Sequence, residues 1–406
     1  MDLATYSLPD LDGSEVVVPA PGPGPGNWSG AASAVVVDGD VYLAYRTRRP
    51  LDDGRGVSVV VARSRDGVHF ETVCEVGGDD FGAESLERPV VLRVPGGGWR
   101  LYLSCATPGS KHWWIEAIDA DRPEDLTSGR RTVVLPGSDT VAVKDPVIVV
   151  DDAGTWHAWI CEHPLTEPGH EDRMSTAYQR SDDGLVWHRR GTVLSPRTGA
   201  WDARGARVSD VISLHPLVVL YDGRARAEDN WHETTGVARG TTPDDASSDL
   251  VADGGVPLRS PYSDGACRYA TSVTMPDGTL RLYLEAARPD GAHDLVTVTG
   301  RPGRSGARSR RERHGAVDVA LVLDERHRVD PGGRQLGPDL ADPRLGVGLR
   351  GEALVGVLLR DERVAARNVV KPPPPRPLGG RRRAEGRGLL GEVHCSRTEV
   401  STKGNA

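Results

Sequence analysis

The last part of the chain lacks aromatic side chains. All nine Trp, all nine Tyr and both Phe lie before residue 284, and residues 301–406 contain none. Because aromatic side chains supply much of the buried area of a core, we expect no packed domain there. The stretch holds 20 Arg and the run KPPPP at 371–375, which indicates an Arg/Gly/Pro-rich extension of low order. Two interpretations stay open: a native basic tail that contacts acidic partners, or a stretch read out of frame, which the composition favours.

Other features are also missing. The N-terminus, MDLATYSLPDLDG, has neither the basic nor the apolar region of a signal peptide, and no run of 18 apolar residues occurs. The net charge of −8 argues against nucleic-acid binding. Five cysteines without CxxC spacing indicate reduced thiols, so we expect a cytoplasmic protein that contacts no membrane. No zinc-ligand spacing, P-loop or GxSxG is present, so we expect no metal and no cofactor.

What the sequence does contain is an internal repeat. Its unit is a short apolar strand, a turn rich in Asp and Gly, and a strand rich in aromatic and β-branched residues. The turn glycines are spaced 58, 57 and 124 residues apart, the last gap being close to twice the others. Alternating apolar positions, as in VYLAYR and WRLYLS, are typical of half-buried strands. The five copies span Ala31–Arg46, Glu87–Ala106, Lys144–Glu162, Ala206–Ala225 and Cys267–Ala287.

Further strands extend these units. Val57–Ser64 and Ser175–Ser181 each lead into the pattern S-x-D-G-x-x-(F/W), in which we interpret Asp66 and Asp183 as turn-forming residues. Five units of four strands predict an all-β, five-bladed β-propeller over residues 28–300. Within residues 1–27, Ser14–Pro19 is a candidate outer strand that closes blade five.

In a propeller the innermost strand of each blade lines a central channel, so the residues that open these strands meet at one mouth. Aligning the units by their turn glycines places charged groups there in four of five blades, which predicts a polar pocket. Local pairing, of Glu87 with Lys144 or of Arg88 with Asp145, is the structural alternative. The candidate residues at this mouth are Trp28, Gly30, Glu87, Arg88, Lys144, Asp145, Arg207, Asp210, Arg268 and Tyr269.

Three segments add candidates near the same mouth. His112 and Trp113 follow blade two, where the pair Trp113–Trp114 forms either a stacking platform for sugar rings or part of the core. Asp222 and Glu233 belong to a blade-four segment rich in hydrogen-bonding groups, which is otherwise a solvated loop. In blade five, Glu285 is either an acid facing the channel or a partner of Arg281 or Arg288, and His293 follows it.

These segments carry a family resemblance. WSGAASAVVVDGDVYLAYR, ERPVVL, VKDPVIVVDDAG and YLEAARPDGAHDL resemble the five-bladed propeller glycosidases, the superfamily of glycoside hydrolase families 43, 62, 117 and 130. In family 43 the resemblance implies a general base (Asp) opening blade one, an orienting Asp opening blade three and a general acid (Glu) opening blade four. Asp145 matches the blade-three residue. Blade one has Gly30-Ala31-Ala32 instead, and blade four has Ala206 and Arg207, with Asp202 and Asp210 as the nearest carboxylates.

The resemblance implies a small carbohydrate as ligand, and the cationic lining adds that it is anionic or bound together with phosphate. We therefore expect an enzyme that cleaves a glycosidic bond, with Asp145 as acid or orienting carboxylate and Glu87 as its partner. A phosphate-dependent glycoside phosphorylase and a non-catalytic sugar-binding propeller are the alternatives. Substrate-binding roles fall to Arg88, Lys144, Arg207, Arg268, Tyr269, Trp28, His112, Trp113, Asp222, Glu233, Glu285 and His293.

Overall fold

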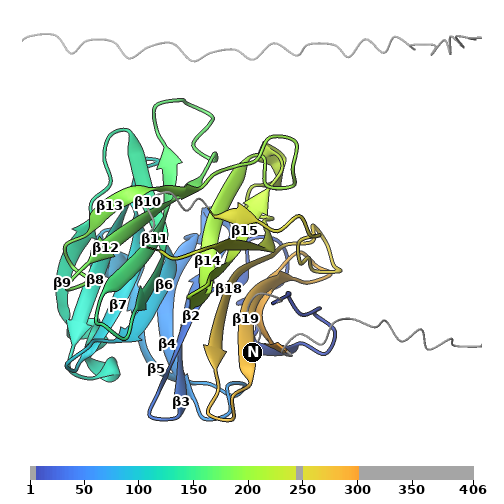
Figure 1. The fold of residues 1–406 in the computed structure, drawn as a ribbon. Coiled ribbons are helices and arrows are strands. Elements are labelled where there is room, and N and C mark those ends of the chain that lie inside the picture. Colours follow the sequence, from blue (N-terminus) through green and yellow to red (C-terminus); the bar gives the residue numbers. More distant parts are fainter. Residues whose placement is uncertain (1–5, 244–249, 301–406) are drawn as a thin grey trace, which may run out of the picture. The chain divides into compact units, whose positions relative to one another are not determined.

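A computed structural model describes residues 6–243 and 250–300 (Figure 1). The chain divides into two units, 1–314 and 315–406, and every described residue belongs to the first. The predicted low-order extension, 301–406, lies outside the described residues. None of the described segments forms a helix that is long and apolar enough to cross a membrane.

The described strands form antiparallel groups in chain order. The first is β2 (Trp28–Val37), β3 (Asp40–Arg48), β4 (Gly56–Ser64) and β5 (Glu71–Gly77). The second is β6 (Leu86–Arg93), β7 (Trp99–Ala106), β8 (Trp113–Ala120) and β9 (Arg130–Leu135). The third is β10 (Val141–Val150), β11 (Trp156–Pro164), β12 (Ser175–Ser181) and β13 (His188–Leu194).

Two groups complete the series. The fourth is β14 (Gly205–Leu214), β15 (Leu217–Arg224), β16 (Thr234–Gly240) and β17 (Val251–Ala252). The fifth is β18 (Cys267–Thr274), β19 (Leu280–Ala287) and β20 (His293–Gly300), and β1 (Glu15–Val18), from the N-terminal segment, pairs antiparallel with β20. Short 3₁₀ helices connect some strands: η2 (Leu51–Asp53), η3 (Gly78–Phe81), η4 (Pro123–Ser128) and η5 (Ala227–Asp229).

The strand groups are joined only weakly through their backbones. Groups four, five and one form one continuous twelve-stranded sheet, but each junction is a single parallel residue pair, Thr234 with Cys267 and Trp28 with His293. Groups two and three are separate four-stranded sheets. Side-chain packing, rather than the hydrogen-bond ladder, therefore holds one group against the next.

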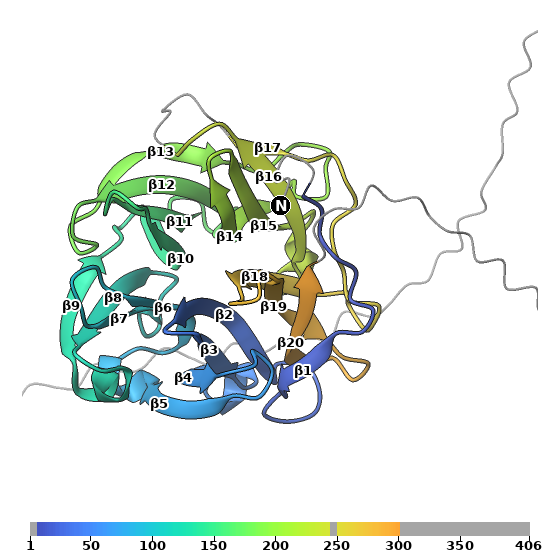
Figure 2. The same cartoon turned by 60° about the horizontal axis from the view of Figure 1, so that its bottom comes forward.

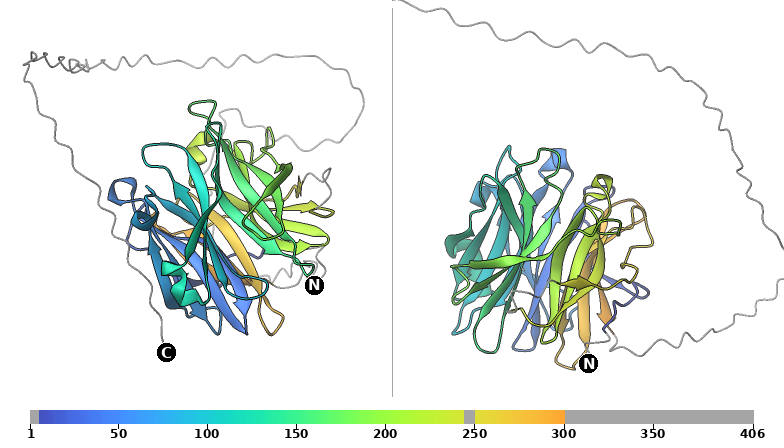
Figure 3. Two further views of the ribbon diagram at one scale, coloured as in Figure 1. Left: turned by 90° about the vertical axis from the view of Figure 1, so that its left-hand side faces the viewer. Right: turned by 45° about the horizontal axis from the view of Figure 1, so that its top comes forward.

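The first strand of each group lies nearest a common centre (Figure 2). Around that centre β2 contacts β6, β6 contacts β10, β10 contacts β14, β14 contacts β18, and β18 contacts β2. The two further views in Figure 3 show the strands from the side, with the turns gathered at the two ends of the strands. The fold is therefore all-β and propeller-like, as predicted.

Each apolar cluster lies between two neighbouring groups. Leu101 of group two packs with Val59 of group one, and Trp156 of group three packs with Tyr102 of group two. The same holds between groups three and four, four and five, and five and one. Alternation explains this arrangement, because successive side chains of a strand point to opposite faces of its sheet and each face meets a different neighbour.

The repeated turn has the structural role that the sequence predicted. Asp66 accepts hydrogen bonds from the Val68 and His69 amides, while the Ser64 hydroxyl accepts one from the Gly67 amide. Ser181 and Asp183 form the same set of bonds in group three. The turn carbonyls of Gly67 and Gly184 then accept hydrogen bonds from Tyr283 and Tyr102 of the preceding group, so these turns also tie neighbouring groups together.

Candidate functional site

Every central strand is interrupted by a bulge a few residues after it begins. The pairing register shifts once near the start of β2, β6, β10, β14 and β18. Ala31, Asp145 and Tyr269 lie in these bulges with φ angles of 51°, 51° and 53°. Positive φ is unfavourable for residues with a Cβ, and bulges commonly re-aim side chains next to functional sites. The strand openings are therefore shaped for more than sheet pairing.

The positions of the bulges show that the sequence alignment of the strand openings was shifted by one residue in group one. The register shifts start at Gly30, Glu87, Lys144 and Arg268, so Gly30 is equivalent to these charged residues. Ala31 is the equivalent of Arg88, Asp145 and Tyr269. Gly30 is required there for a steric reason, since a Cβ would collide with the Glu285 carboxylate. Group one thus contributes no charged side chain of its own at either position.

The strand-opening residues of separate groups do meet. Arg207 donates to Asp145 Oδ2 at 2.8 Å and to the Tyr269 hydroxyl at 3.0 Å through Nη1, and to Asp222 at 2.9 Å through Nη2. Asp222 also accepts a hydrogen bond from the Tyr269 backbone amide. All four residues are buried. Groups three, four and five are thereby joined by one ionic cluster at the axis.

A second buried cluster joins groups five and one. Glu285 accepts from Arg46 at 2.7 Å, from both sides of the Arg268 guanidinium at 2.8 and 2.9 Å, and contacts His293 Nδ1 at 2.9 Å. The second carboxylate that binds Arg268 is Glu233, at 2.6 Å, and Glu233 also pairs with Arg224. The two predicted alternatives for Glu285 are therefore wrong: it pairs with neither Arg281 nor Arg288, and it does not face the channel as a free acid.

The predicted local pairs are also different from those observed. Glu87 forms its ion pair with Arg46, at 3.0 Å, and not with Lys144. Asp145 pairs with Arg207 and, at 3.6 Å, with Lys144, but not with Arg88. Some ion-pair partners of these residues, such as Arg46 and Asp222, lie on the second strand of a group and not at a strand opening. Alignment of the strand openings alone therefore did not find them.

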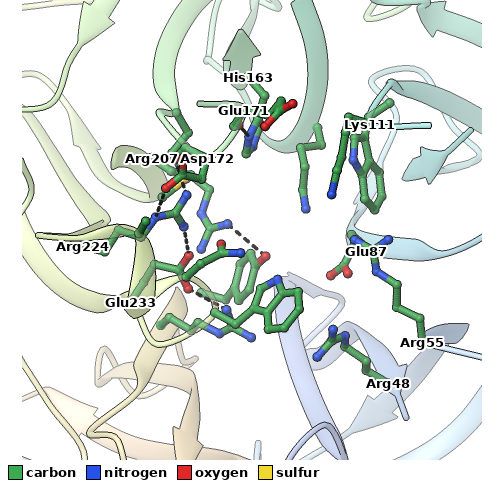
Figure 4. A pocket seen from close by; sticks show the side chains of 18 of the residues that line it. Arg48, Arg55, Glu87, Lys111, His163, Glu171, Asp172, Arg207, Arg224 and Glu233 are labelled. Carbon is green, nitrogen blue, oxygen red and sulfur yellow. Dashed lines mark hydrogen bonds and ion pairs between the residues drawn. The ribbon is translucent and has the colours of Figure 1, made fainter. Parts of the chain in front are cut away.

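Above these clusters lies a cavity of about 270 Å³ (Figure 4). Of the predicted site residues, eight line it: Trp28, Glu87, Trp113, Lys144, Arg207, Glu233, Arg268 and Tyr269. Among the described residues its lining contains seven Lys and Arg and four carboxylates, which are Glu87, Glu171, Asp172 and Glu233. We call this cavity the axial pocket.

Six of the residues that were assigned a catalytic or substrate-binding role do not line the axial pocket. Asp145, Asp222, Glu285 and His293 are fully buried beneath it in the ionic clusters. His112 contacts the Thr107 hydroxyl at 2.7 Å instead. Arg88 lines a different cavity, where its Nη2 donates to the Ser209 carbonyl at 2.5 Å. Direct contact with a ligand in the axial pocket is therefore not expected for these six.

The adjacent tryptophans of β8, Trp113 and Trp114, lie in different environments. Trp113 lines the axial pocket, where Lys144 Nζ lies 4.2 Å from the centre of its ring and the Arg55 guanidinium 5.2 Å. Trp114 packs against the core between groups one and two. Trp28 stacks on His293 with ring centres 4.5 Å apart and also contacts two guanidinium groups. The pocket aromatics therefore hold cations, which the sequence did not predict.

The carboxylates of the axial pocket are held in the ionised form. Burial alone would raise the pKa of Glu87, but the charges of Arg46 and Lys144 outweigh it and lower the pKa to about 2. Burial of Glu233 is likewise outweighed by Arg268 and Arg224, so its pKa is also lowered. Backbone amides lower the pKa of Glu171, and Arg204 outweighs burial to lower that of Asp172. At neutral pH these groups are therefore ionised and cannot act as proton donors.

Three pocket residues were missed at the sequence level: Arg48, Arg55 and His163. The signal for Arg48 was present in β3, where the apolar alternation of VYLAYR ends in Arg-Thr-Arg. Charged residues at the end of a buried strand point to a site as much as those at its beginning.

The channel has a second cavity of about 440 Å³, lined by valines of the central strands together with Arg88, Asp210 and Ser272. Asp210 is buried, and this raises its pKa to about 6, although the Ser272 hydrogen bond and Arg88 act against the shift. A raised folded-state pKa means that the group's contribution to stability is fully present below about pH 4 and is lost as the pH rises through 6.

Asp210→Asn should therefore stabilise the protein at pH 8 by up to about 3 kcal/mol and by only about half as much at pH 5. The amide keeps the size of the carboxyl group but has no charge to desolvate. Urea unfolding at the two pH values measures the difference. Equal effects at pH 5 and pH 8 would mean that Asp210 does not titrate in this range.

No group of three or more His, Cys, Asp or Glu side chains able to hold a metal ion occurs within residues 6–243 and 250–300. The four cysteines in these ranges are unpaired and buried, as expected for structural thiols. Burial raises the pKa of Cys74 to about 11, so its thiol is protonated at neutral pH.

No protein-family model matches the sequence, and no curated protein matches it. Solved structures do resemble the fold. A thermostable family-43 glycoside hydrolase is 16% identical, with a TM-score of 0.53 over 68% of this chain and 94% of its own. The GH43_1 enzyme from Xanthomonas citri, complexed with xylose, is 14% identical, with a TM-score of 0.51 over 73% and 91%. A β-1,2-mannobiose phosphorylase from Listeria innocua, complexed with β-1,2-mannobiose, is 15% identical, with a TM-score of 0.50 over 72% and 92%.

At these identities the likeness concerns the fold. It agrees with the resemblance found in the sequence. The chain has the fold shared by family-43-like glycoside hydrolases and related phosphorylases.

Proposed function

We propose that the chain is a carbohydrate-active enzyme that cleaves a glycosidic bond in the axial pocket of a five-bladed β-propeller. The five antiparallel groups are the blades, and β1 completes the fifth. The observation that carries the proposal is the pocket itself. It lies where the central strands open, is lined by Glu87 and by aromatic rings, and its 270 Å³ is near the lower end of small-molecule sites, about 300 to 1,000 Å³. That size suits one terminal sugar unit.

Within this proposal Glu87 is the carboxylate that acts on the substrate. It lines the pocket, is ionised, and is fixed by Arg46, so it can accept a proton from an attacking water, while the leaving oxygen takes its proton from solvent. Asp145 is a positioning residue, because it is fully buried and holds Arg207, which does line the pocket. The sequence-based hypothesis instead gave Asp145 the role of acid or orienting carboxylate and made Glu87 its partner.

Phosphorolysis is the alternative reaction. Inverting hydrolysis uses a carboxylic acid of raised pKa and a separate base, whereas phosphate needs no activated water. Ala31 at the blade-one base position and the surplus of Lys and Arg in the lining favour phosphate as acceptor. A sugar-binding propeller without turnover is favoured by the lowered pKa values of the pocket carboxylates.

One experiment separates these functions. The full chain is incubated with a panel of aryl glycosides and disaccharides, both neutral and acidic, with and without inorganic phosphate, and products are identified by mass spectrometry. We expect release of a monosaccharide. Formation of a sugar 1-phosphate, with a strong acceleration by phosphate, would assign phosphorolysis. Binding of a sugar, seen by calorimetry, without turnover of any panel member would overturn the enzymatic proposal.

A further inference from the structure

The positive charges of the axial pocket differ in whether they are compensated. Arg207, Arg224 and Arg268 each contact carboxylates, which are supplied by Asp145, Asp222, Glu233, Glu285 and Asp172. Figure 4 shows Arg224, Glu233 and Asp172 on one side of the pocket, with Arg48, Arg55 and Glu87 across from them. On that second side the pairing is incomplete.

Arg48 is the uncompensated cation. It is 2% exposed and lines the pocket, yet within the described ranges it forms no ion pair, and its Nε has no hydrogen-bond partner. Burial lowers its pKa to about 10, with Glu87 acting on it only from beyond ion-pair distance. A buried guanidinium without a counter-ion is costly for the folded protein, so its retention next to an open pocket requires a reason.

Two indole rings hold Arg48 in place. Its guanidinium carbon lies 4.0 Å from the ring centre of Trp28, its cross-strand partner, and 4.9 Å from that of Trp231. Contact with aromatic faces stabilises the cation while leaving the in-plane N–H groups available. Those N–H groups form the planar fork that pairs with a carboxylate or phosphate through two hydrogen bonds.

Neighbouring cations strengthen the same side of the pocket. Arg55 is paired only with Glu84, at 3.7 Å and partly exposed to solvent, and Lys111 is exposed. Lys144 lies over Trp113 and is 3.6 Å from Asp145. The carboxylates of the pocket lining near these cations are Glu87, which Arg46 already neutralises, and Glu171, which is within electrostatic reach of Lys111. The side therefore carries a net positive charge.

We infer that Arg48, held between Trp28 and Trp231, binds an oxyanion. The pocket then takes either a uronate, whose own carboxylate is the anion, or a sugar bound together with phosphate. This inference rests on the proposal that the axial pocket holds a sugar, and it adds the substrate class. It also accounts for the uncompensated cation, because the counter-ion arrives with the ligand.

The test compares the wild-type protein with Arg48→Met by calorimetry. The probes are glucuronate and galacturonate, the matched neutral sugars glucose and galactose, and inorganic phosphate alone. A charge-assisted fork is worth about a tenfold to hundredfold change in affinity, so we expect each uronate to bind at least tenfold more tightly than its neutral counterpart. Arg48→Met should bring the ratio of the two affinities to about one, whatever its effect on the affinity for sugars in general.

Arg63→Gln is the matched control, since Arg63 lies on the adjacent strand β4, is exposed and pairs with Asp40. It should keep the uronate preference. Arg48→Met should unfold at the same temperature as the wild type or higher, because it removes an uncompensated buried charge. If that variant does not fold, the wild-type protein alone still decides. Either a uronate preference or tighter binding of neutral sugars in the presence of phosphate must exist, and it must weaken as NaCl rises from 0.05 to 0.5 M.

The outcomes separate the inference from the proposed function. Equal affinities for uronates and neutral sugars both with and without phosphate, or a preference that survives in Arg48→Met, would overturn the inference even if neutral glycosides are cleaved. A uronate preference that depends on Arg48, without turnover of any glycoside, would support the inference and overturn the enzymatic proposal. If phosphate binds alone and competes with uronate, the two anions share one oxyanion site. If phosphate instead promotes the binding of neutral sugars, phosphate is the anion that Arg48 binds.

Discussion

Glu285→Gln should lower the free energy of unfolding by about 3 to 5 kcal/mol, the range for breaking a buried ion pair by removing one partner. The carboxylate is fully buried and compensates both Arg46 and Arg268. Glutamine keeps the size that Gly30 makes room for, so the loss is electrostatic rather than steric. Urea unfolding at pH 7 measures it, and Glu75→Gln, an exposed position on β5, should change stability by less than about 0.5 kcal/mol.

The pH dependence of this loss provides a check. The pKa of Glu285 is well below its usual range, because Arg268 and Arg46 outweigh the effect of burial. A lowered folded-state pKa gives stability that is present above the unfolded value and is lost as the pH falls. The difference between wild type and Glu285→Gln should therefore be constant from pH 8 to about 5 and should shrink below pH 4. A loss under 1 kcal/mol at pH 7 would mean that the two arginines are compensated in another way.

The strand repeats were predictable because their signals are local. Alternation of apolar residues and a Gly-containing turn between two strands are contained within a short window, and the structure has strands in all five copies, including the weak fourth one at β14 and β15. The Ser-x-Asp-Gly turns were equally readable, since the bonds of Asp66 go to residues two and three positions away.

The site was predictable only in part, because its decisive contacts join distant segments. Arg46 and Glu285 are separated by 239 positions, and nothing near either residue identifies the other. The meaning of Gly30 depends on the same carboxylate, so a glycine that looked like a missing catalytic residue is a steric requirement. Glu87 lines the pocket, whereas Asp145 is buried beneath it. This difference depends on the side-chain directions that the bulges set, which the sequence does not show.

Glu87→Gln should reduce turnover by about 10² to 10⁴-fold, the contribution of a well-placed proton acceptor, while sugar affinity changes little. The amide cannot accept the proton of an attacking water, yet it keeps the size of the side chain and a hydrogen-bond acceptor for Arg46. Turnover is measured on the substrate that the panel identifies, and binding by calorimetry. Glu162→Gln, whose side chain pairs with Arg189 outside the axial pocket, is the control and should keep full activity.

The acid side of the pH–rate profile tests the assignment independently. Because the pKa of Glu87 is about 2, the group stays ionised throughout the range in which the protein is stable. Activity that depends on its basic form should thus show no decline between pH 7 and pH 5. A decline with an apparent pKa near 5 or 6 would place the base on another residue. An unchanged turnover number in Glu87→Gln would remove Glu87 from the reaction altogether, leaving it the structural task of neutralising Arg46.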